Sequence, residues 1–174
     1  MSNKAKVAIL MGSDSDLLVM SEAAKVLDEN GAAYELKILS AHRSPDDVAL
    51  FAKSARAKGF KVIIAGAGGS AHLAGVIASH TTLPVIGVPM ETKELKGIDS
   101  LFSTVQMPSG VPVATVSIGR AGAKNAGILA LQILSLNDKV LEKRLAELKK
   151  DLVAGIRKKN AKNNCFKSCC KPSR

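Results

Sequence analysis

The chain has 174 residues, which suits a single domain, and no apolar run approaches the roughly 18 residues that a membrane-spanning helix requires. Hydrophobic residues make up 47% of the sequence and aromatic residues only 3%, so we expect an aliphatic core. The first residues lack the apolar segment of a signal peptide, and all three cysteines lie in the last ten residues, so we expect a cytoplasmic protein. The net charge of +10 lies almost wholly at the C-terminal end: residues 1–138 carry 13 Lys and Arg against 12 Asp and Glu, and residues 139–174 carry 12 against 3. This distribution argues against nucleic-acid binding by residues 1–138.

Short β-branched runs alternate with helix-length amphipathic stretches along the first 135 residues. Strands are predicted for Lys6–Met11, Tyr34–Leu39, Lys61–Ala65, Pro84–Val88 and Val113–Ser117, and helices for Asp16–Asn30, Pro45–Lys58, Ala71–His80, Ile98–Gln106 and Ala121–Ser135. Gly31 and Gly59 follow the first two helices, where a chain commonly leaves a helix through a left-handed residue. Five strands, each followed by a helix, predict an α/β fold with a parallel sheet covered on both faces.

The last predicted helix of this series has an apolar segment, residues 127–134, that shows almost no polar face. Such an element is buried either in the core of its own chain or against another subunit. We therefore expect an oligomer, with a buried core position as the alternative.

The C-terminal part of the chain predicts a charged amphipathic helix from Asp138 to about Lys159. Residues 160–174 have too little apolar area to offset the entropy of ordering them, so we expect a single domain over residues 1–159 and a basic, disordered tail over residues 160–174. Three thiolates in this tail without a nearby fourth ligand make a poor zinc site; they are Cys165, Cys169 and Cys170.

Three predicted loops follow the first three strands and are rich in small and polar residues. In an open parallel sheet, ligands bind beyond the carboxyl ends of the strands, because helix N-termini point into a shared crevice there. In the first loop, Ser13 offers a hydroxyl at a helix start, which suits a phosphate, and the Asp16 carboxylate suits the hydroxyls of a ribose. The alternative is that Ser15 or Asp16 only caps the helix.

The second loop places a histidine beside an arginine, followed by a helix start at Pro45. The Arg43 guanidinium supplies the positive charge and the paired donors that a phosphate dianion needs. An imidazole gives and takes protons near neutral pH, so His42 is the best candidate for a general acid and base. The alternative for His42 is a purely structural role.

The third loop contains glycines at positions 66, 68 and 69 and ends at His72. Its backbone can approach a flat ligand closely and can donate amides to a carboxylate or to carbon dioxide. His72 lies at the start of the next helix, and two roles are possible for it: contact with a ligand, or structural support of the loop. His80, at the end of that helix, is predicted to lie on the surface.

The order of these loops resembles one enzyme family, the class I N5-carboxyaminoimidazole ribonucleotide mutases, or PurE family, over about residues 6–155. Arg43 directly after His42 is similar to the mutase class, whereas the related class that uses free carbon dioxide typically has Lys there. The resemblance rests on these segments: Met11-Gly12-Ser13-Asp14-Ser15-Asp16, Ser40-Ala41-His42-Arg43-Ser44-Pro45, Ala65-Gly66-Ala67-Gly68-Gly69-Ser70-Ala71-His72-Leu73, Asp99-Ser100-Leu101 and Val105-Gln106-Met107-Pro108.

The resemblance implies a flavodoxin-like three-layer αβα sandwich around a central parallel five-stranded sheet, plus a C-terminal helix that packs on a neighbour in a homo-octamer. It also implies an isomerase of purine biosynthesis that moves a carboxyl group on a phosphorylated aminoimidazole ribonucleotide, with no metal and no other cofactor. It assigns the phosphate to Ser13 and Arg43, the ribose to Asp16, the carboxyl group to Ser40 and the loop of Gly68 and Gly69, and the proton transfers to His42; His72 is grouped with the substrate-binding residues.

Two other functions fit parts of the sequence. Residues 66–71 match the loose G-x-G-x-x-A pattern of dinucleotide-binding oxidoreductases, with Glu91 downstream, but the pattern follows the third strand and leaves the other loops unexplained. The basic tail could contact nucleic acid or an anionic membrane, but a solvated terminus is the favoured explanation, and few aromatic side chains are available for base stacking.

Overall fold

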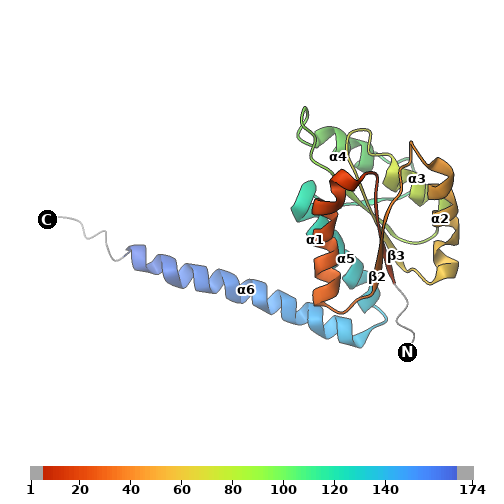
Figure 1. Cartoon of the computed structure of the whole chain (residues 1–174). Helices are drawn as coiled ribbons and strands as arrows, with labels where there is room; N and C mark the ends of the chain where they lie inside the picture. Colours follow the sequence, from red (N-terminus) through yellow and green to blue (C-terminus); the bar gives the residue numbers. More distant parts are fainter. Residues whose placement is uncertain (1–5, 168–174) are drawn as a thin grey trace. The chain divides into compact units, whose positions relative to one another are not determined.

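A computed structural model describes the backbone of residues 6–167. The described residues form two compact units, divided between Leu134 and Ser135. The first unit contains a five-stranded sheet with the strand order β2-β1-β3-β4-β5, in which every neighbouring pair is parallel (Figure 1). The strands are β1 Val7–Met11, β2 Tyr34–Ile38, β3 Val62–Ala67, β4 Val85–Pro89 and β5 Ala114–Thr115. The prediction of a flavodoxin-like α/β fold is confirmed.

Helices cover both faces of this sheet. They are α1 Leu17–Glu29, α2 Pro45–Lys58, α3 Leu73–His80, α4 Ile98–Val105 and α5 Gly119–Ser135, with a short 3-10 helix, η1 Asp14–Asp16, ahead of α1. In Figure 1, α1 and α5 lie on one side of the sheet and α2 and α3 on the other. The helix ends agree with the predicted ones to within two residues, and Gly31 and Gly59 both have the predicted positive φ.

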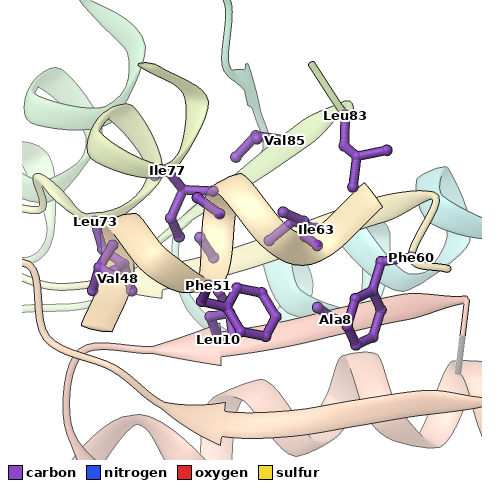
Figure 2. Close-up of a cluster of buried hydrophobic side chains, with 14 residues drawn as sticks. Ala8, Leu10, Val48, Phe51, Phe60, Ile63, Leu73, Ile77, Leu83 and Val85 are labelled. Carbon is purple, nitrogen blue, oxygen red and sulfur yellow. The ribbon is translucent and has the colours of Figure 1, made fainter. Parts of the chain in front are cut away.

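The strand β1 is buried along its whole length, as expected for a central parallel strand covered on both faces. One side of the core packs residues of β1 and β3 against α2 and α3 (Figure 2). Phe51 and Phe60 lie there with ring centroids 5.6 Å apart. This aliphatic and aromatic layer fixes the carboxyl ends of the strands relative to the starts of α2 and α3.

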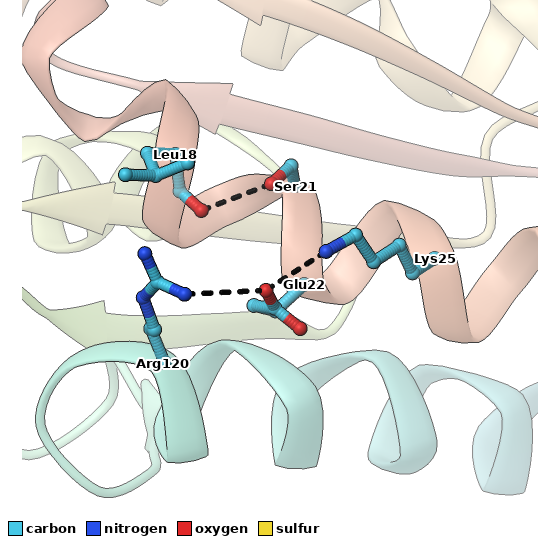
Figure 3. A network of polar contacts seen from close by, with 5 residues as sticks. All are labelled: Leu18, Ser21, Glu22, Lys25 and Arg120. Atoms are coloured by element: carbon cyan, nitrogen blue, oxygen red, sulfur yellow. Dashed lines mark hydrogen bonds and ion pairs between the residues drawn. The ribbon is translucent and has the colours of Figure 1, made fainter.

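On the other side of the sheet, α1 and α5 approach closely because α5 has a glycine at the contact. A Cβ atom on Gly127 would lie 3.0 Å from the Ala23 carbonyl oxygen and 3.0 Å from the Val26 Cβ. At the edge of this contact, Glu22 pairs with Lys25 at 3.0 Å and with Arg120 at 3.9 Å (Figure 3). The hydrogen bond from Lys25 and the neighbouring positive charges lower the pKa of Glu22 below its ordinary value.

The second unit contains α6, Lys139–Lys167, which continues beyond the residue at which the sequence predicted it to end. The prediction that helical structure stops at Asn160 is therefore wrong for residues 160–167. Extending an established helix avoids the cost of nucleation, and Lys and Ala are good helix formers. Residues 168–174, with Cys169 and Cys170, lie outside the described residues, and a single domain over residues 1–159 stays a prediction.

No helix between residues 6 and 167 is both long enough and apolar enough to cross a membrane, since the 29-residue α6 is densely charged.

Candidate functional site

A cavity of about 390 Å³ lies at the carboxyl ends of β1, β2 and β3. The loops that follow these three strands line it, as the parallel topology predicts. Of the predicted site residues, all but Gly69 line the cavity: Ser13, Asp16, Ser40, His42, Arg43, Gly68 and His72. The remaining lining residues are Gly12, Ser15, Ala41, Ala67, Ala71 and Leu73.

The first loop presents polar groups at the start of η1. Ser13 is the N-cap of η1, and its hydroxyl oxygen accepts a hydrogen bond from the Ser15 amide at 3.3 Å. Asp16 occupies the N-cap position of α1, but its side chain makes no capping hydrogen bond. Ser13 thus caps η1 alone, and the Asp16 carboxylate, which accepts from the Ser15 hydroxyl at 3.3 Å, lines the cavity without capping α1.

Partial burial sets the electrostatics of Asp16. Desolvation raises the pKa of its carboxyl group above the ordinary value, and this effect outweighs the opposing hydrogen bonds from Ser15 and Ser13 and the attraction of Arg43. A carboxylate that has lost part of its hydration gains more from donors on a ligand than a fully solvated one does.

In the second loop, Arg43 reaches back across the cavity edge to the first loop. One terminal nitrogen of its guanidinium donates to the Gly12 carbonyl oxygen at 2.6 Å, and Nε lies 3.4 Å from the Ser40 hydroxyl oxygen. Ser44 closes the loop, because its hydroxyl accepts from the Ser40 amide and donates to the Ser40 carbonyl, both at 3.2 Å. These bonds fix the guanidinium between the first two loops, with other N–H groups left to bind an anion.

A second hollow of about 300 Å³ adjoins the cavity. It shares Gly12, Ser13, Ser40 and Arg43 with the cavity and adds Asp14, Ile38 and Ser44. Arg43 therefore lines both spaces.

The two histidines predicted for the site contact each other directly. The His42 Nε2 lies 2.7 Å from the His72 Nδ1, and the rings meet edge to face, with centroids 4.9 Å apart and an interplanar angle of 84°. One of the two nitrogens must carry the shared proton, so each ring fixes the tautomer of the other. His80 lies exposed at the end of α3, as predicted.

The third loop lines the cavity with Ala67, Gly68, Ala71 and His72, whereas Gly69 is not among the lining residues. The Gly69 amide donates to the Ser100 hydroxyl oxygen of α4 at 2.9 Å, so it is not free to face a ligand. The sequences of the three loops assign no role to Ser100, although the segment containing it, Asp99-Ser100-Leu101, is one of those that carry the resemblance. Ala41 and Leu73 form an apolar part of the wall that the polar residues of the loops do not indicate.

Among the residues whose side chains are described, no group of three or more His, Cys, Asp or Glu is placed to hold a metal ion. The side chains of Cys165, Cys169 and Cys170 lie outside that set. The predicted absence of a metal therefore stays a prediction.

Comparison with known proteins gives one consistent result. A family model described as AIR carboxylase matches residues 6–154. The N5-carboxyaminoimidazole ribonucleotide mutase of Pyrococcus horikoshii is 54% identical over 158 residues, covering 91% of this chain and 88% of that protein. The Bacillus subtilis protein of the same name is 60% identical over 141 residues, covering 81% and 87%.

A solved structure gives the same result for the fold. The crystal structure of Treponema denticola PurE superimposes with a TM-score of 0.81 at 30% sequence identity, covering 90% of this chain and 96% of that one.

Proposed function

The chain belongs to the AIR carboxylase family, and we propose that it acts as an N5-carboxyaminoimidazole ribonucleotide mutase in purine biosynthesis. The observation that carries the proposal is the convergence of Ser13, Asp16, His42 and Arg43 on one cavity. This set offers a phosphate site, a ribose acceptor and an acid and base within one space. Relatives more than 50% identical over most of their length bear this name.

The nucleotide is held by the first two loops in this proposal. Its phosphate lies between the Ser13 hydroxyl and the Arg43 guanidinium, whose position is fixed by its bond to the Gly12 carbonyl. The ribose hydroxyls donate to Asp16, which replaces the hydration that burial has removed from this carboxylate.

The migrating carboxyl group faces Ser40 and the backbone of Gly68. The Ser40 hydroxyl oxygen accepts from the Arg43 amide at 3.2 Å and lies 3.4 Å from the Arg43 Nε, so its own hydrogen is left to donate to a carboxylate. The small side chains of Ala41, Ala67 and Ala71 leave room for a flat imidazole ring.

His42 moves the proton. It protonates the exocyclic nitrogen as the nitrogen–carbon bond breaks; the electron pair of that bond stays on nitrogen and carbon dioxide is released into the cavity. The C4 carbon of the imidazole then attacks carbon dioxide, a carbon–carbon bond forms, and the C4 proton passes to His42, which restores both the aromatic ring and the protonated histidine. His42 Nδ1 has no partner among the described residues, while Nε2 is held by His72.

The dinucleotide-binding alternative loses support at the third loop. A pyrophosphate site needs free amides at a helix start, but the Gly69 amide is bonded to Ser100, and α3 begins only at Leu73. We expect an aminoimidazole ribonucleotide to raise the melting temperature of the protein and NADH to leave it unchanged.

The oligomeric state belongs to the proposal as well. We expect a homo-octamer, and the support from this chain is an apolar face on α4, where Ile98, Phe102 and Val105 are 46%, 58% and 47% exposed at helical spacing. Light scattering is expected to give the mass of eight chains of 18.2 kDa, and a monomer mass would contradict it. The cytoplasmic location stays a prediction.

A direct assay tests the activity. Purified protein is mixed with N5-carboxyaminoimidazole ribonucleotide without ATP or bicarbonate, and formation of 4-carboxy-5-aminoimidazole ribonucleotide is followed by ultraviolet absorbance. His42→Asn is expected to bind the nucleotide nearly as well as the wild type while losing about 10²–10⁴-fold in turnover, because it removes the proton carrier alone. His80→Asn, at the exposed end of α3, is the matched control. Turnover in His42→Asn equal to that of His80→Asn would exclude the catalytic role.

A further inference from the structure

We propose that Ser100 is a positioning residue that holds the third loop in the conformation needed to retain carbon dioxide during the transfer. This inference rests on the proposed mutase function. The observation behind it is that α4 bonds both polar groups of one loop residue: the Ser100 hydroxyl oxygen accepts from the Gly69 amide at 2.9 Å, and the Ser103 hydroxyl donates to the Gly69 carbonyl at 3.4 Å. Ser100 itself lines no part of the cavity.

The turn at Gly69 depends on such bonds because this residue has no side chain to pack. Gly69 has a φ of +63°, and no atom lies within 4 Å of the position that its Cβ would take. Gly68 is in closer surroundings, since a Cβ there would lie 3.3 Å from the Met90 Cβ and 3.9 Å from the Ser100 hydroxyl oxygen. A backbone without side chains adopts many conformations, and hydrogen bonds to a fixed element reduce that number.

Ser100 is well suited to be that fixed element, since it is fully buried. Thr104, one helical turn later, donates from its hydroxyl to the Ser100 carbonyl oxygen at 2.7 Å. The start of α4 is tied down as well, because Thr92 donates to the Asp99 carboxylate at 2.8 Å and accepts from the Gly97 amide at 3.0 Å. A buried hydroxyl on a helix whose start is held in this way can fix the position of the loop.

The position of this loop determines whether carbon dioxide stays in the cavity until C4 attacks it. Two cavity-lining residues of the loop, Ala67 and Gly68, precede Gly69 directly, so a shift of Gly69 moves the part of the wall against which the carboxyl group lies. If this wall opens, carbon dioxide leaves before C4 attacks it. The substrate then takes up one proton at nitrogen, keeps its C4 hydrogen, and is released as aminoimidazole ribonucleotide and free carbon dioxide.

The variant Ser100→Ala removes the bond with little change in volume. We expect kcat for product formation to fall about 10- to 100-fold, as for a small misplacement of a reacting group, while the dissociation constant for the nucleotide changes less than about 3-fold. The share of turnovers that release free carbon dioxide is expected to rise. Ser103→Ala, which removes the longer bond to the same glycine, is expected to act in the same direction and more weakly.

Ser54→Ala is the matched control, because this helical serine bonds only carbonyls of its own helix, at 2.8 and 3.2 Å. Product formation and carbon dioxide release in Ser100→Ala that equal those of Ser54→Ala would overturn the proposal. Equal losses in kcat and nucleotide binding would also overturn it, since they indicate a general disturbance of the site.

A second measurement separates this inference from the proposed activity. Hydrogen exchange of the peptide spanning residues 66–72 is expected to be faster in Ser100→Ala than in Ser54→Ala, whichever reaction the wild type catalyses. Unchanged exchange would refute the positioning role. A wild type that fails to convert the nucleotide, with exchange still faster in the variant, would refute the mutase function alone.

Discussion

The packing of α4 on β4 can be tested at Gly87, where helix and strand approach too closely for any side chain on the strand. A Cβ at this position would lie 2.4 Å from the Thr104 Cγ2 and 2.9 Å from the Val113 Cγ1. Thr104 is only 3% exposed and its hydroxyl is bonded to Ser100, so the methyl group cannot turn away. We therefore expect Gly87→Ala to push α4 off the sheet.

Overpacking of this kind costs about 1–3 kcal/mol, and the lower chain entropy of Ala in the unfolded state offsets about 0.5–1 kcal/mol. The free energy of unfolding should fall by about 1–2 kcal/mol, which lowers the melting temperature by roughly 5 °C in a chain of this size. Catalytic turnover should fall too, because Ser100 moves with α4.

The double variant Gly87→Ala/Thr104→Ser makes the test specific. It removes the clashing methyl group and keeps the hydroxyl bonded to the Ser100 carbonyl. In a double-mutant cycle from urea unfolding, we expect a favourable coupling of about 1 kcal/mol. Gly155→Ala, on α6 with open space around its Cβ, is the control and should be neutral or stabilising. Additive effects of the two substitutions would refute the steric argument.

Two further predictions concern the site. Because burial raises the pKa of Asp16, the folded protein keeps this proton to a higher pH than the unfolded chain, and stability is lost as the pH rises through the raised pKa. Asp16→Asn should therefore be more stable than the wild type at neutral pH, by less than about 1 kcal/mol since the carboxyl group is half solvated, and this gain should shrink in thermal melts at lower pH. The KM of this variant for the nucleotide should rise about 10-fold. A less stable Asp16→Asn at neutral pH would contradict the direction. His72→Phe keeps a flat ring beside His42 but removes the nitrogen that lies 2.7 Å from His42 Nε2, so kcat should fall about 5- to 10-fold with little change in KM. His72→Gln keeps a polar partner for His42 and should recover most of the lost kcat. Equal kcat in the Phe variant and the wild type would show that the contact does not contribute to turnover.

Much of this fold follows from local preferences that can be recognised in the sequence. Strands of five apolar residues such as Val7–Met11 and helices begun by Pro45 or ended by Gly59 obey steric and capping preferences that act within a few residues. Because a helix connects each strand to the next, the strands are expected to be parallel. Their carboxyl ends, and the loops that follow them, then lie at the same edge of the sheet. For α6 the same rules gave the start but not the end, because polar residues after Asn160 extend a helix that is already formed.

Strand and helix types and the edge of the sheet that bears the cavity could be predicted from the amino-acid sequence, and seven of the eight predicted site residues line that cavity. How those residues contact one another depends on the packing of the whole fold. The 2.7 Å contact of His42 with His72 and the bond from Gly69 to Ser100 join residues 30 and 31 positions apart, and the closeness of such groups depends on how whole helices pack on the sheet. Helix packing is set by the summed volumes of many core side chains, so no local pattern in the chain encodes these distances.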